Sequence, residues 1–568
     1  MAVLRLSQLT LPLDHSEAEL RAAVCRRLRL DSHQLVGLRL VKRSVDARKP
    51  KAIALVYSLD LELALDPGAE ARLLRRFAKD PQLGPSPDTT YQPVAHAGGN
   101  GLRPVVVGAG PCGYFAALVL AQMGFRPLLL ERGKAIRERT ADTFGFWKGT
   151  RRFDPESNAQ FGEGGAGTFS DGKLYSQVSE AKSYVRKVLE ELVAAGANPE
   201  ILTLHHPHIG TYKLATVVRG LRRRIEALGG EVRFQCRVEG LELGPLDRAI
   251  RGLELAGGER IRADRVVLAL GHSARDSFAM LKGAGVAMQP KPFAVGLRIE
   301  HPQSLIDRAR WGEAAGHPRL GAAEYKLVHH CSAEALKGRS VYSFCMCPGG
   351  LVVGATSEAG RVVTNGMSQH SRNERNANSG LVVSIGLDDL SAYGEDPGDP
   401  LAGVAFQRHW EGQAYAAAGS TYQAPAQLVG DFLARRPSLG AQGVQPSYQP
   451  GVRFGDLDRC LPGFVLEAIR EALPVFERRI PGYTMDGALL TGVETRTSSP
   501  LRLPRDQTTL ECINTPGLFP AGEGAGYAGG ILSAAIDGIK VAEQVALSIT
   551  RPHLRRQGAP GGSVCDPV

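Results

Sequence analysis

The chain has 568 residues, a formal net charge of +10 at pH 7 and nine cysteines. Its length allows three or four domains of ordinary size, and the lack of an uncharged apolar run of about 18 residues argues against a membrane-spanning helix. The N-terminus has no apolar block like that of a signal peptide, and scattered cysteines in a long chain argue against a disulfide framework. We therefore expect a cytoplasmic protein.

Residues 1–95 are predicted to form a small α+β domain followed by a linker. Alternation of polar and apolar residues predicts strands, and helical spacing predicts helices. The strands are expected near 2–12, 35–43 and 52–63, and the helices at 16–28 and 69–79. Proline, glycine and asparagine are frequent in 81–103, which favours a linker.

The stretch 105–133, VVVGAGPCGYFAALVLAQMGFRPLLLERG, predicts a strand, a glycine-rich turn, a helix over about 112–123 and a second strand. Gly108, Gly110 and Gly113 match G-x-G-x-x-G, in which glycines permit a tight turn, approach of a pyrophosphate and close helix packing. The helix N-terminus would face the phosphates. Glu131 can accept hydrogen bonds from a ribose diol and would repel the extra phosphate of NADP. The alternative is a glycine-rich turn that binds no nucleotide.

The middle of the chain alternates between helical and strand patterns. Residues 215–228 predict a helix and 266–270 a buried strand, after which Gly271 lets the chain turn beside a cofactor. We expect 277–490 to be an inserted domain, with the polar stretch 365–380 (NGMSQHSRNERNANSG) outside its core. The tail, 551–568, is rich in proline, glycine and basic residues and predicts disorder.

A second nucleotide pattern occurs near the C-terminus, in 517–547 (GLFPAGEGAGYAGGILSAAIDGIKVAEQV). Residues 518–521 predict a strand that ends at Gly522, and the carboxylate of Glu523 can bind a ribityl hydroxyl. Gly529 and Gly530 open a helix whose N-terminus can stabilise negative charge on a reduced flavin. Two such patterns on one chain predict FAD bound in an extended form, whereas a simple NAD-dependent dehydrogenase would need only the first.

Six further motifs support a resemblance over nearly the whole chain. They are NAQFGEGGAGTFSDGKL (158–174), KPFAVGLRIEHPQ (291–303), FCMCPGGLVV (344–353), NGMSQHSRNERNAN (365–378), GSTYQAPAQ (419–427) and GVETRTSSPLR (492–502). With the two nucleotide motifs, they resemble the uncharacterised FAD-dependent dehydrogenases of bacteria and plastids, within the glutathione-reductase-like FAD superfamily. Tyr212 and Gly419-Ser420 depart from the family pattern, which puts any role of those positions in doubt.

The resemblance implies an α/β fold and a cofactor, and leaves the substrate open. The implied fold has a glutathione-reductase-like, Rossmann-type FAD-binding domain, an inserted α+β substrate domain and the added N-terminal α+β domain. The expected boundaries are 96–276 and 491–550 for the discontinuous FAD-binding domain and 277–490 for the inserted domain.

The loop 161–174 is the richest candidate site. Its glycines would let the backbone lie against FAD, and Lys173 near the flavin would stabilise an anionic reduced ring or an anionic substrate. The alternative is that Asp171 and Lys173 only hold the loop in place. The residues expected to contact FAD are Gly108, Gly110, Pro111, Gly113, Glu131, Arg132, Gly162, Gly164, Gly165, Gly167, Ser170, Lys173, Gly271, Gly522, Glu523, Gly529, Gly530 and Ile531.

Lys173, His272 and Arg496 are the candidate catalytic residues. His272 follows the strand at 266–270 and either lies over the flavin or is a turn residue. Arg496 and Arg298 can each bind a substrate carboxylate with two N–H groups, or form a buried ion pair with Glu494 or Glu300. Further candidates for the pocket lining are Asn376, Asn378, Tyr422 and Gln427.

Cysteines and histidines raise two other possibilities. Cys345 and Cys347 share one face of a strand, so they are either a redox dithiol or two small buried side chains before a turn. His205, His206 and His208 surround a proline, which argues against regular metal ligation, and we expect no metal site.

We therefore expect an FAD-dependent oxidoreductase that exchanges hydride at flavin N5 with a small organic, possibly anionic, substrate. An unidentified second partner would donate or accept electrons, and NAD(P)H could bind transiently. Two alternatives remain: a flavin-dependent RNA-modifying enzyme, suggested by the positive charge, and a non-catalytic flavoprotein that senses redox state.

Overall fold

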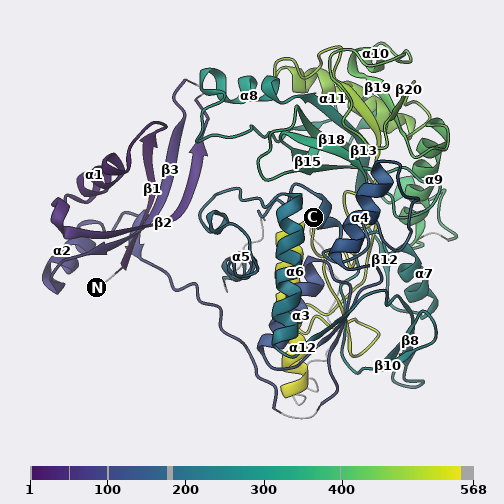
Figure 1. Ribbon diagram of the computed structural model, residues 1–568, viewed down its shortest axis with the longest axis horizontal. Helices are drawn as coiled ribbons and strands as arrows, with labels where there is room; N and C mark the ends of the chain where they lie inside the picture. The colour runs from purple at the N-terminus through teal and green to yellow at the C-terminus, as the bar shows by residue number, and fades with distance from the viewer. Residues whose placement is uncertain (1–2, 50, 99–100, 176–182, 397, 552–568) are drawn as a thin grey trace.

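The computed structural model describes residues 3–49, 51–98, 101–175, 183–396 and 398–551. The chain forms an N-terminal domain, a domain built on a parallel sheet and a domain built on a large mixed sheet (Figure 1). The tail predicted to be disordered lies outside the described residues, except for Arg551. In the part of the chain that is described, no helix has the length and apolar character needed to cross a membrane.

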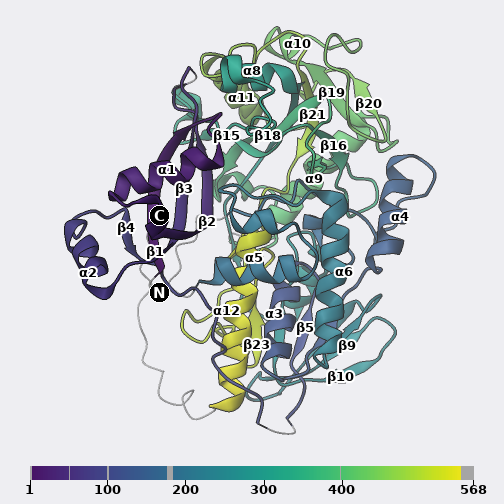
Figure 2. The same cartoon turned by 60° about the vertical axis from the view of Figure 1, so that its left-hand side comes forward.

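The N-terminal domain is an antiparallel sheet with strand order β2-β3-β1-β4, accompanied by two helices (Figure 2). Helix α1 starts with a capping box, in which Ser16 and Glu19 each bond the other's backbone N–H. Leucines from the strands and α1 form its core. The elements are β1 (Val3–Pro12), α1 (Glu17–Leu28), β2 (Leu35–Asp46), β3 (Ala54–Leu63), α2 (Pro67–Arg76) and β4 (Leu83–Pro85), close to the predicted ranges.

This domain contacts both of the others. The backbone N–H of Arg43 in β2 donates to the carbonyl of Thr203 (2.7 Å), and the N–H of His205 donates to the carbonyl of Arg43 (3.0 Å). Arg319 donates to the carbonyls of Leu13 and His15, both at 2.8 Å. The first pair of bonds joins β2 to the parallel-sheet domain, and the second joins the N-terminal domain to the mixed-sheet domain.

The second domain contains a parallel sheet with strand order β23-β11-β5-β6-β7, so strands from distant parts of the chain lie side by side. Helices α3, α5, α6 and α12 pack on one face, and β8 and β9 of an antiparallel three-stranded sheet pack on the other, together with α7. A Cβ on Gly538 of α12 would collide with the carbonyl of Cys112, so glycine is needed where α12 crosses α3.

The elements of this domain are β5 (Val105–Val107), α3 (Pro111–Gln122), β6 (Leu128–Leu130), α4 (Ile136–Trp147), α5 (Tyr184–Ala194), α6 (Thr211–Ala227), β7 (Glu231–Arg233), β8 (Val238–Leu243), β9 (Ile250–Leu255), β10 (Arg260–Arg262), β11 (Val266–Leu268), α7 (Arg275–Gly283), β12 (Gln289–Pro290), β22 (Leu501–Arg502), β23 (Leu518–Pro520) and α12 (Ile531–Thr550). Single-turn 3₁₀ helices occur along the chain at η1 (Ser32–Gln34), η2 (Ala166–Phe169), η3 (Pro199–Leu202), η4 (Gly312–Ala314), η5 (Glu334–Leu336) and η6 (Asp388–Leu390).

The inserted domain is built on a seven-stranded sheet with strand order β14-β15-β18-β13-β21-β19-β20. The long antiparallel pair β13 and β18 lies at its centre and is almost entirely buried. Its elements are β13 (Phe293–Pro302), α8 (Gln303–Trp311), β14 (Val328–His330), β15 (Ser340–Cys347), β16 (Gly350–Gly354), β17 (Thr364–Ser368), β18 (Asn376–Ile385), α9 (Ala402–Ala417), β19 (Ala424–Leu428), α10 (Val429–Leu433), β20 (Val452–Phe454), α11 (Gly463–Glu477) and β21 (Leu489–Glu494).

Three sequence expectations differ from this structure. The expected boundary at 276 falls inside α7, whose Phe278 and Leu281 belong to the core beneath the parallel sheet. The boundary at 491 falls inside β21, which pairs with β13 in the seven-stranded sheet. The stretch 365–380 is irregular only over 369–375, because its two ends supply most of β17 and half of β18. Its Asn376 and Asn378 are buried since they hydrogen-bond to Glu300 and Arg298.

Candidate functional site

One cleft lies between the parallel-sheet domain and the inserted domain, with about 1530 Å³ of space free of protein atoms, its mouth included. Its lining begins at the first glycine loop and Glu131, passes the 160–173 loop, His272 and Glu523, and ends at side chains of the inserted domain. The inserted domain and the segment after β21 contribute Phe344, Cys345, Asn365, Glu494, Arg496 and Thr497.

The structure brings most of the expected residues to this cleft. Those that line it are Gly108, Gly110, Pro111, Glu131, Arg132, Gly165, Gly167, Ser170, Lys173, Gly271, His272, Arg496, Glu523, Gly530 and Ile531. Gly113, Gly162, Gly164, Gly522 and Gly529 are not part of the lining. Of these, Gly113, Gly162, Gly164 and Gly522 have neighbours so close that a Cβ would collide with them, which gives these glycines a packing role.

The first glycine loop connects β5 to α3. Gly108 has φ +108°, and a Cβ on Gly113 would collide with the carbonyl of Gly108, so the turn is possible only with glycine at both positions. Gly110 is the N-cap of α3 and Pro111 its first residue. The free N–H groups of this helix terminus suit a phosphate.

Glu131 stands at the end of β6 and is buried. Its Oε2 accepts a hydrogen bond from the N–H of Ala109 (2.8 Å), and its Oε1 accepts from Gly133 (2.9 Å) and Gly162 (3.0 Å). A carboxylate has about four acceptor positions, so one stays available for a ribose hydroxyl. Glu131 therefore joins the two glycine loops while it lines the cleft.

Arg132 also lines the cleft, but its guanidinium is already paired with two carboxylates. Its guanidinium bonds both oxygens of Glu156 (2.9 Å each) and both oxygens of Asp276 (2.8 and 2.9 Å), and it lies over the ring of Phe161. Two carboxylates thus balance this arginine.

The second glycine loop rests on an arginine that the sequence analysis did not single out. Arg139 of α4 is fully buried, and its guanidinium donates to five backbone carbonyls between residues 158 and 165 at 2.7–3.2 Å. Burial lowers its pKa to about 10, so it stays charged at neutral pH. In the sequence, Arg139 stands among charged residues of a helix, and nothing there separates it from a surface arginine.

Lys173 and Asp171 belong to a charged network at one end of the cleft. Asp171 is buried and pairs with the guanidinium of Arg372, with Nε to Oδ1 at 2.9 Å. Lys173 donates to the carbonyl of Met346 and lies 3.9 Å from Glu324. Burial opposes the charge of Lys173, but Asp171, Cys347 and Cys345 outweigh it and raise the pKa, so Lys173 is a cation in the cleft wall.

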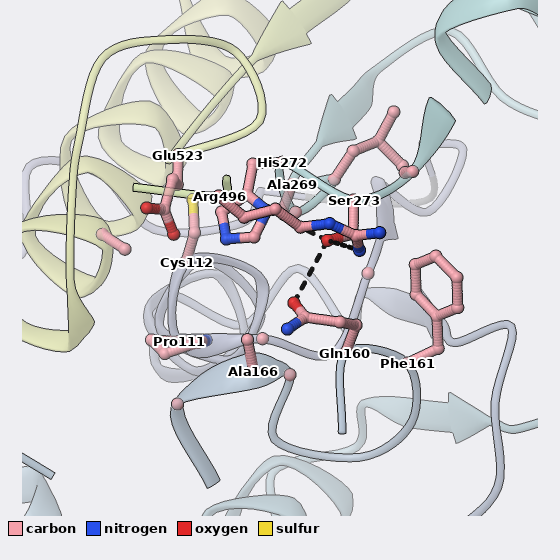
Figure 3. A pocket seen from close by; sticks show the side chains of 18 of the residues that line it. Pro111, Cys112, Gln160, Phe161, Ala166, Ala269, His272, Ser273, Arg496 and Glu523 are labelled. Carbon is pink, nitrogen blue, oxygen red and sulfur yellow. Dashed lines mark hydrogen bonds between the residues drawn. The ribbon is translucent and has the colours of Figure 1, made fainter. Parts of the chain in front are cut away.

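The C-terminal motif closes the other side. Strand β23 leads to Gly522, whose N–H donates to Asp537 (2.7 Å), and Gly530 is the N-cap of the long helix α12. Glu523 faces the cleft (Figure 3). Burial raises its pKa to about 7 against the opposing charge of Lys291, so near neutral pH its carboxyl is part protonated.

His272 and Arg496 lie together in the wall, with Ser273 and Gln160 beside them (Figure 3). Arg496 donates to Ser273 Oγ (2.9 Å), which donates in turn to Gln160 (3.2 Å). Burial and the charges of Arg496 and Arg275 lower the pKa of His272 to about 3. His272 is therefore a neutral imidazole at physiological pH.

Both arginines form buried ion pairs, and Arg298 does so with one of the two expected carboxylates, whereas Arg496 pairs with another one. Arg496 bonds the carboxylate of Glu411 with Nε (3.1 Å) and Nη2 (3.0 Å), and Glu411 also accepts from Arg275 (2.6 Å). Glu494 instead pairs with Arg298, Nε to Oε2 at 2.9 Å. Glu411 comes from the middle of α9, and no sequence pattern linked it to residue 496.

The secondary pocket candidates do not line the cleft. Asn376 and Asn378 of β18 hydrogen-bond to the buried charged groups of Glu300 and Arg298 in β13. The hydroxyl of Tyr422 accepts from the N–H of Gly360, and Gln427 donates to the carbonyl of Arg436. His205 and His206 stack on each other with ring centroids 4.3 Å apart, and His206 bonds Glu324 (2.9 Å). These side chains hold loops and the sheet together.

A possible metal-ligand group lies elsewhere. His329, Cys331 and Glu471 place ligand atoms within 4.8 Å of one another. Glu471 already accepts hydrogen bonds from the backbone of Ser332 (2.6 Å) and from His329 (2.9 Å), so its carboxylate serves the loop and we assign it no metal.

The residues present fit FAD. A helix N-terminus for the diphosphate, a carboxylate for the ribose and a second helix N-terminus beside Glu523 border one continuous cleft, and the facing glycines 110 and 165 leave no side chain between them. This arrangement defines an FAD-dependent oxidoreductase. The family model "FAD dependent oxidoreductase" matches residues 173–379, and "FAD-dependent protein, C-terminal domain-like" matches 292–497.

The chain belongs to the same family of FAD-dependent oxidoreductases as a protein of Clostridium beijerinckii (strain ATCC 51743 / NCIMB 8052). That relative, called "Uncharacterized protein", is 44% identical over 547 residues, which cover 95% of this chain and 98% of the relative. Residues 3–62 match a domain of unknown function (DUF8436).

Solved structures are more distant. CtdE in complex with FAD is 13% identical with a TM-score of 0.31, over 79% of this chain and 88% of that one. PqsL, a probable FAD-dependent monooxygenase from Pseudomonas aeruginosa, is 14% identical with a TM-score of 0.33, over 80% and 89%. The assignment therefore depends on the family models and on the Clostridium relative. Nothing in them points to RNA or to a non-catalytic role.

Proposed function

We propose that the protein transfers hydride between FAD and a small organic anion held at the inserted-domain end of the cleft. The observation that carries this proposal is the continuity of the cleft, from the first glycine loop to the side chains beyond Glu523. FAD supplies a two-electron hydride carrier at N5. The side chains around that end decide which molecule can approach it.

Charge supports an anionic substrate. Lys173 is cationic, as described, and Arg496 lines the cleft with its guanidinium fixed by Glu411 and Ser273. Arg496, Arg275 and Arg408 share two carboxylates, Glu411 and Glu358, so this cluster keeps one positive charge. A carboxylate near Lys173 and Arg496 would balance that charge.

His272 is suited to accept a proton or a hydrogen bond. Its Nδ1 lies 3.0 Å from Ser273 Oγ, which fixes the ring, and its low pKa keeps it neutral. Glu523, with a pKa of about 7, can give or take a proton near neutral pH. Together they provide a neutral acceptor and a carboxyl that is part protonated on the cleft wall.

The test is anaerobic bleaching of the flavin absorbance. NADH, NADPH and a panel of small organic acids, each with its neutral amide, are added separately to the FAD-loaded protein. We expect an acid to act at least about tenfold faster than its amide, equivalent to about 1.4 kcal/mol, and Lys173→Met to remove this preference. Equal rates for acids and amides would contradict an anionic substrate.

The nicotinamides answer a second question in the same experiment. Rapid bleaching by NADH or NADPH would identify the electron donor and make the organic anion the acceptor. Bleaching by an acid alone would make the anion the donor. Lys337→Met, at an exposed lysine that is not part of the cleft lining, is the control for loss of positive charge.

A further inference from the structure

Strand β15 ends with two cysteines, and the first of them leaves the regular sheet. Phe344 pairs with Gly380 and Cys347 with Asn378, so Cys345 and Met346 together stand opposite one residue of β18. This is a β-bulge, and Cys345 has φ +43°, in the left-handed region that side chains other than glycine rarely adopt. Bulges next to active sites redirect a side chain, and here Cys345 lines the cleft.

The two cysteines are in contact. The thiol of Cys347 donates to the carbonyl oxygen of Cys345 at 3.3 Å, and Cys347 is the first cause that lowers the pKa of the Cys345 thiol. Cys347 is completely buried behind Cys345. Both are free thiols in this structure. One cysteine therefore lines the cleft, and the second is buried beside it, bonded to its backbone.

The surroundings of Cys345 favour a thiolate. Arg298, on the neighbouring β13, is fully buried and donates to the carbonyl of Cys345 (3.2 Å). The hydrogen bond from Cys347 and the charges of Arg298 and Lys173 outweigh burial and the opposing carboxylate of Glu494, and they lower the pKa of Cys345 to about 6. A partly exposed cysteine with a lowered pKa is the reactive kind.

The competing explanation is that both cysteines are small buried side chains. It describes Cys112, Cys347 and Cys460 well, because burial is among the causes that raise the pKa of each of these thiols. It does not describe Cys345, which has a strained backbone, a cleft-facing position and a lowered pKa. Strain that persists in a folded protein is concentrated at functional sites.

We propose that Cys345 and Cys347 form a redox-active pair that exchanges electrons with FAD. In the oxidation, the Cys345 thiolate and the Cys347 thiol lose two electrons, the Cys347 proton leaves, and a disulfide bond forms. FAD is the oxidant and takes up the two electrons and the proton. The reverse step restores the thiolate and the thiol. Glu523 marks the flavin end of the cleft, and Cys345 is close enough for its charge to affect that carboxyl.

The local geometry suits such a cycle. A disulfide between residues two positions apart closes a small ring, and strained disulfides are the easily reduced, catalytic kind. The proposed chemistry adds a thiol or disulfide compound as a class of external partner, since Cys345 is the sulfur that a small thiol in the cleft can reach. The pair's behaviour does not depend on the organic anion proposed above.

The first test counts electrons. The FAD-loaded protein is oxidised with ferricyanide, freed of oxidant and titrated anaerobically with dithionite. We expect the wild type to take up about four electrons per FAD, two for the flavin and two for the disulfide, and Cys345→Ser and Cys347→Ser to take up about two. Cys331→Ser, at a partly exposed cysteine outside the cleft, should behave as the wild type. Uptake of about two electrons by the wild type would overturn the proposal.

The second test needs neither activity nor flavin absorbance. Trypsin cleavage after Arg339 and Arg361 releases one peptide that contains Cys345, Cys347 and no other cysteine. After oxidation and alkylation, we expect this peptide unalkylated and two hydrogen atoms lighter than the dithiol. A doubly alkylated peptide would contradict the proposal even if the serine variants failed to fold. A four-electron titration in a protein that no organic acid bleaches would instead contradict only the anionic substrate.

Discussion

The two ends of the cleft are built in opposite ways. At the nucleotide end the cleft surface is formed mainly by backbone, from glycines and helix termini. The buried guanidinium of Arg139 hydrogen-bonds to backbone carbonyls of the second glycine loop. At the inserted-domain end, charged side chains from distant segments meet, such as Arg275, Glu411 and Arg496. The first end is therefore sensitive to the size of a side chain, and the second to its charge.

Removal of the central carboxylate should have the largest effect on stability. Glu411→Ala takes the carboxylate partner from buried Arg496 and leaves buried Arg275 paired with Glu358, and breaking a buried ion pair costs about 3–5 kcal/mol. The free energy of unfolding in urea measures this cost. Glu190→Ala removes a helical ion pair with Arg186 that is more exposed, and should cost less than about 1 kcal/mol. Equal losses in the two variants would show that this buried cluster contributes no more to stability than a surface ion pair.

The next largest effect is expected at the nucleotide end, from the addition of one methyl group at Gly113. Gly113→Ala places a Cβ against the carbonyl of Gly108, and overpacking of this kind costs about 1–3 kcal/mol. Since the loop must shift, we expect the dissociation constant of FAD to rise at least about tenfold. Flavin retained after gel filtration reports this change. The control is Gly283→Ala, where nothing lies near the new methyl group. Full flavin content in Gly113→Ala would show that the loop adapts.

A smaller effect is expected from His272, and it depends on pH. Its pKa falls from a usual 6.5 to about 3 in the folded protein, so the unfolded chain binds more protons between these values. The stability that neutral His272 contributes is present above pH 6.5 and is lost as the pH falls toward 3. From about pH 7 to about pH 5, we expect the wild type to lose about 1 kcal/mol more than His272→Gln, with allowance for partial exposure. His330→Gln, at an exposed histidine, should follow the wild type, and parallel losses in all three would count against the assignment.

The smallest effect is expected from Arg132→Gln, in contrast to a change at its neighbour Glu131. Arg132→Gln breaks contacts with Glu156 and Asp276, which are partly exposed, so FAD binding should change less than about threefold. Glu131→Gln places an amide where three backbone N–H groups need acceptors, and binding should weaken at least about tenfold. Titration of each apoprotein with FAD measures both. The reverse order would mean that the arginine, and not the acid, contacts the cofactor.

The sequence predicted the nucleotide end well because its signals are local. Fewer than 30 residues contain the glycine turn at 108–110, the helix after it and Glu131. Each of these features has a physical reason for its place. The helix expected at 112–123 is α3, at Pro111–Gln122. Identification of FAD as the cofactor is confirmed by the family models, while the individual contacts to it stay predictions.

The other end could not be predicted because partners there are far apart in the chain. Glu411 stands 85 residues from Arg496, and Arg298 pairs with Glu494, not with its near neighbour Glu300. The asparagines of β18 were predicted to lie outside the core because they are polar. They are buried because each is hydrogen-bonded to a buried charged residue, and a polar side chain is tolerated in a core when it has such a partner. The domain boundaries were missed at β21 and α7 because neither strand pairing nor helix packing is visible in sequence.

The position of the N-terminal domain has a mechanical consequence. The backbone of Arg43 hydrogen-bonds to residues 203 and 205 of the parallel-sheet domain. Residues 13–15 hydrogen-bond to His317 and Arg319 of the inserted domain. One set of contacts is with each of the two domains that enclose the cleft, so the N-terminal domain bridges them. Any hinge motion that separates these two domains must therefore distort or break one set of these hydrogen bonds. Access to the cleft is thereby tied to a domain of which no described residue lines it.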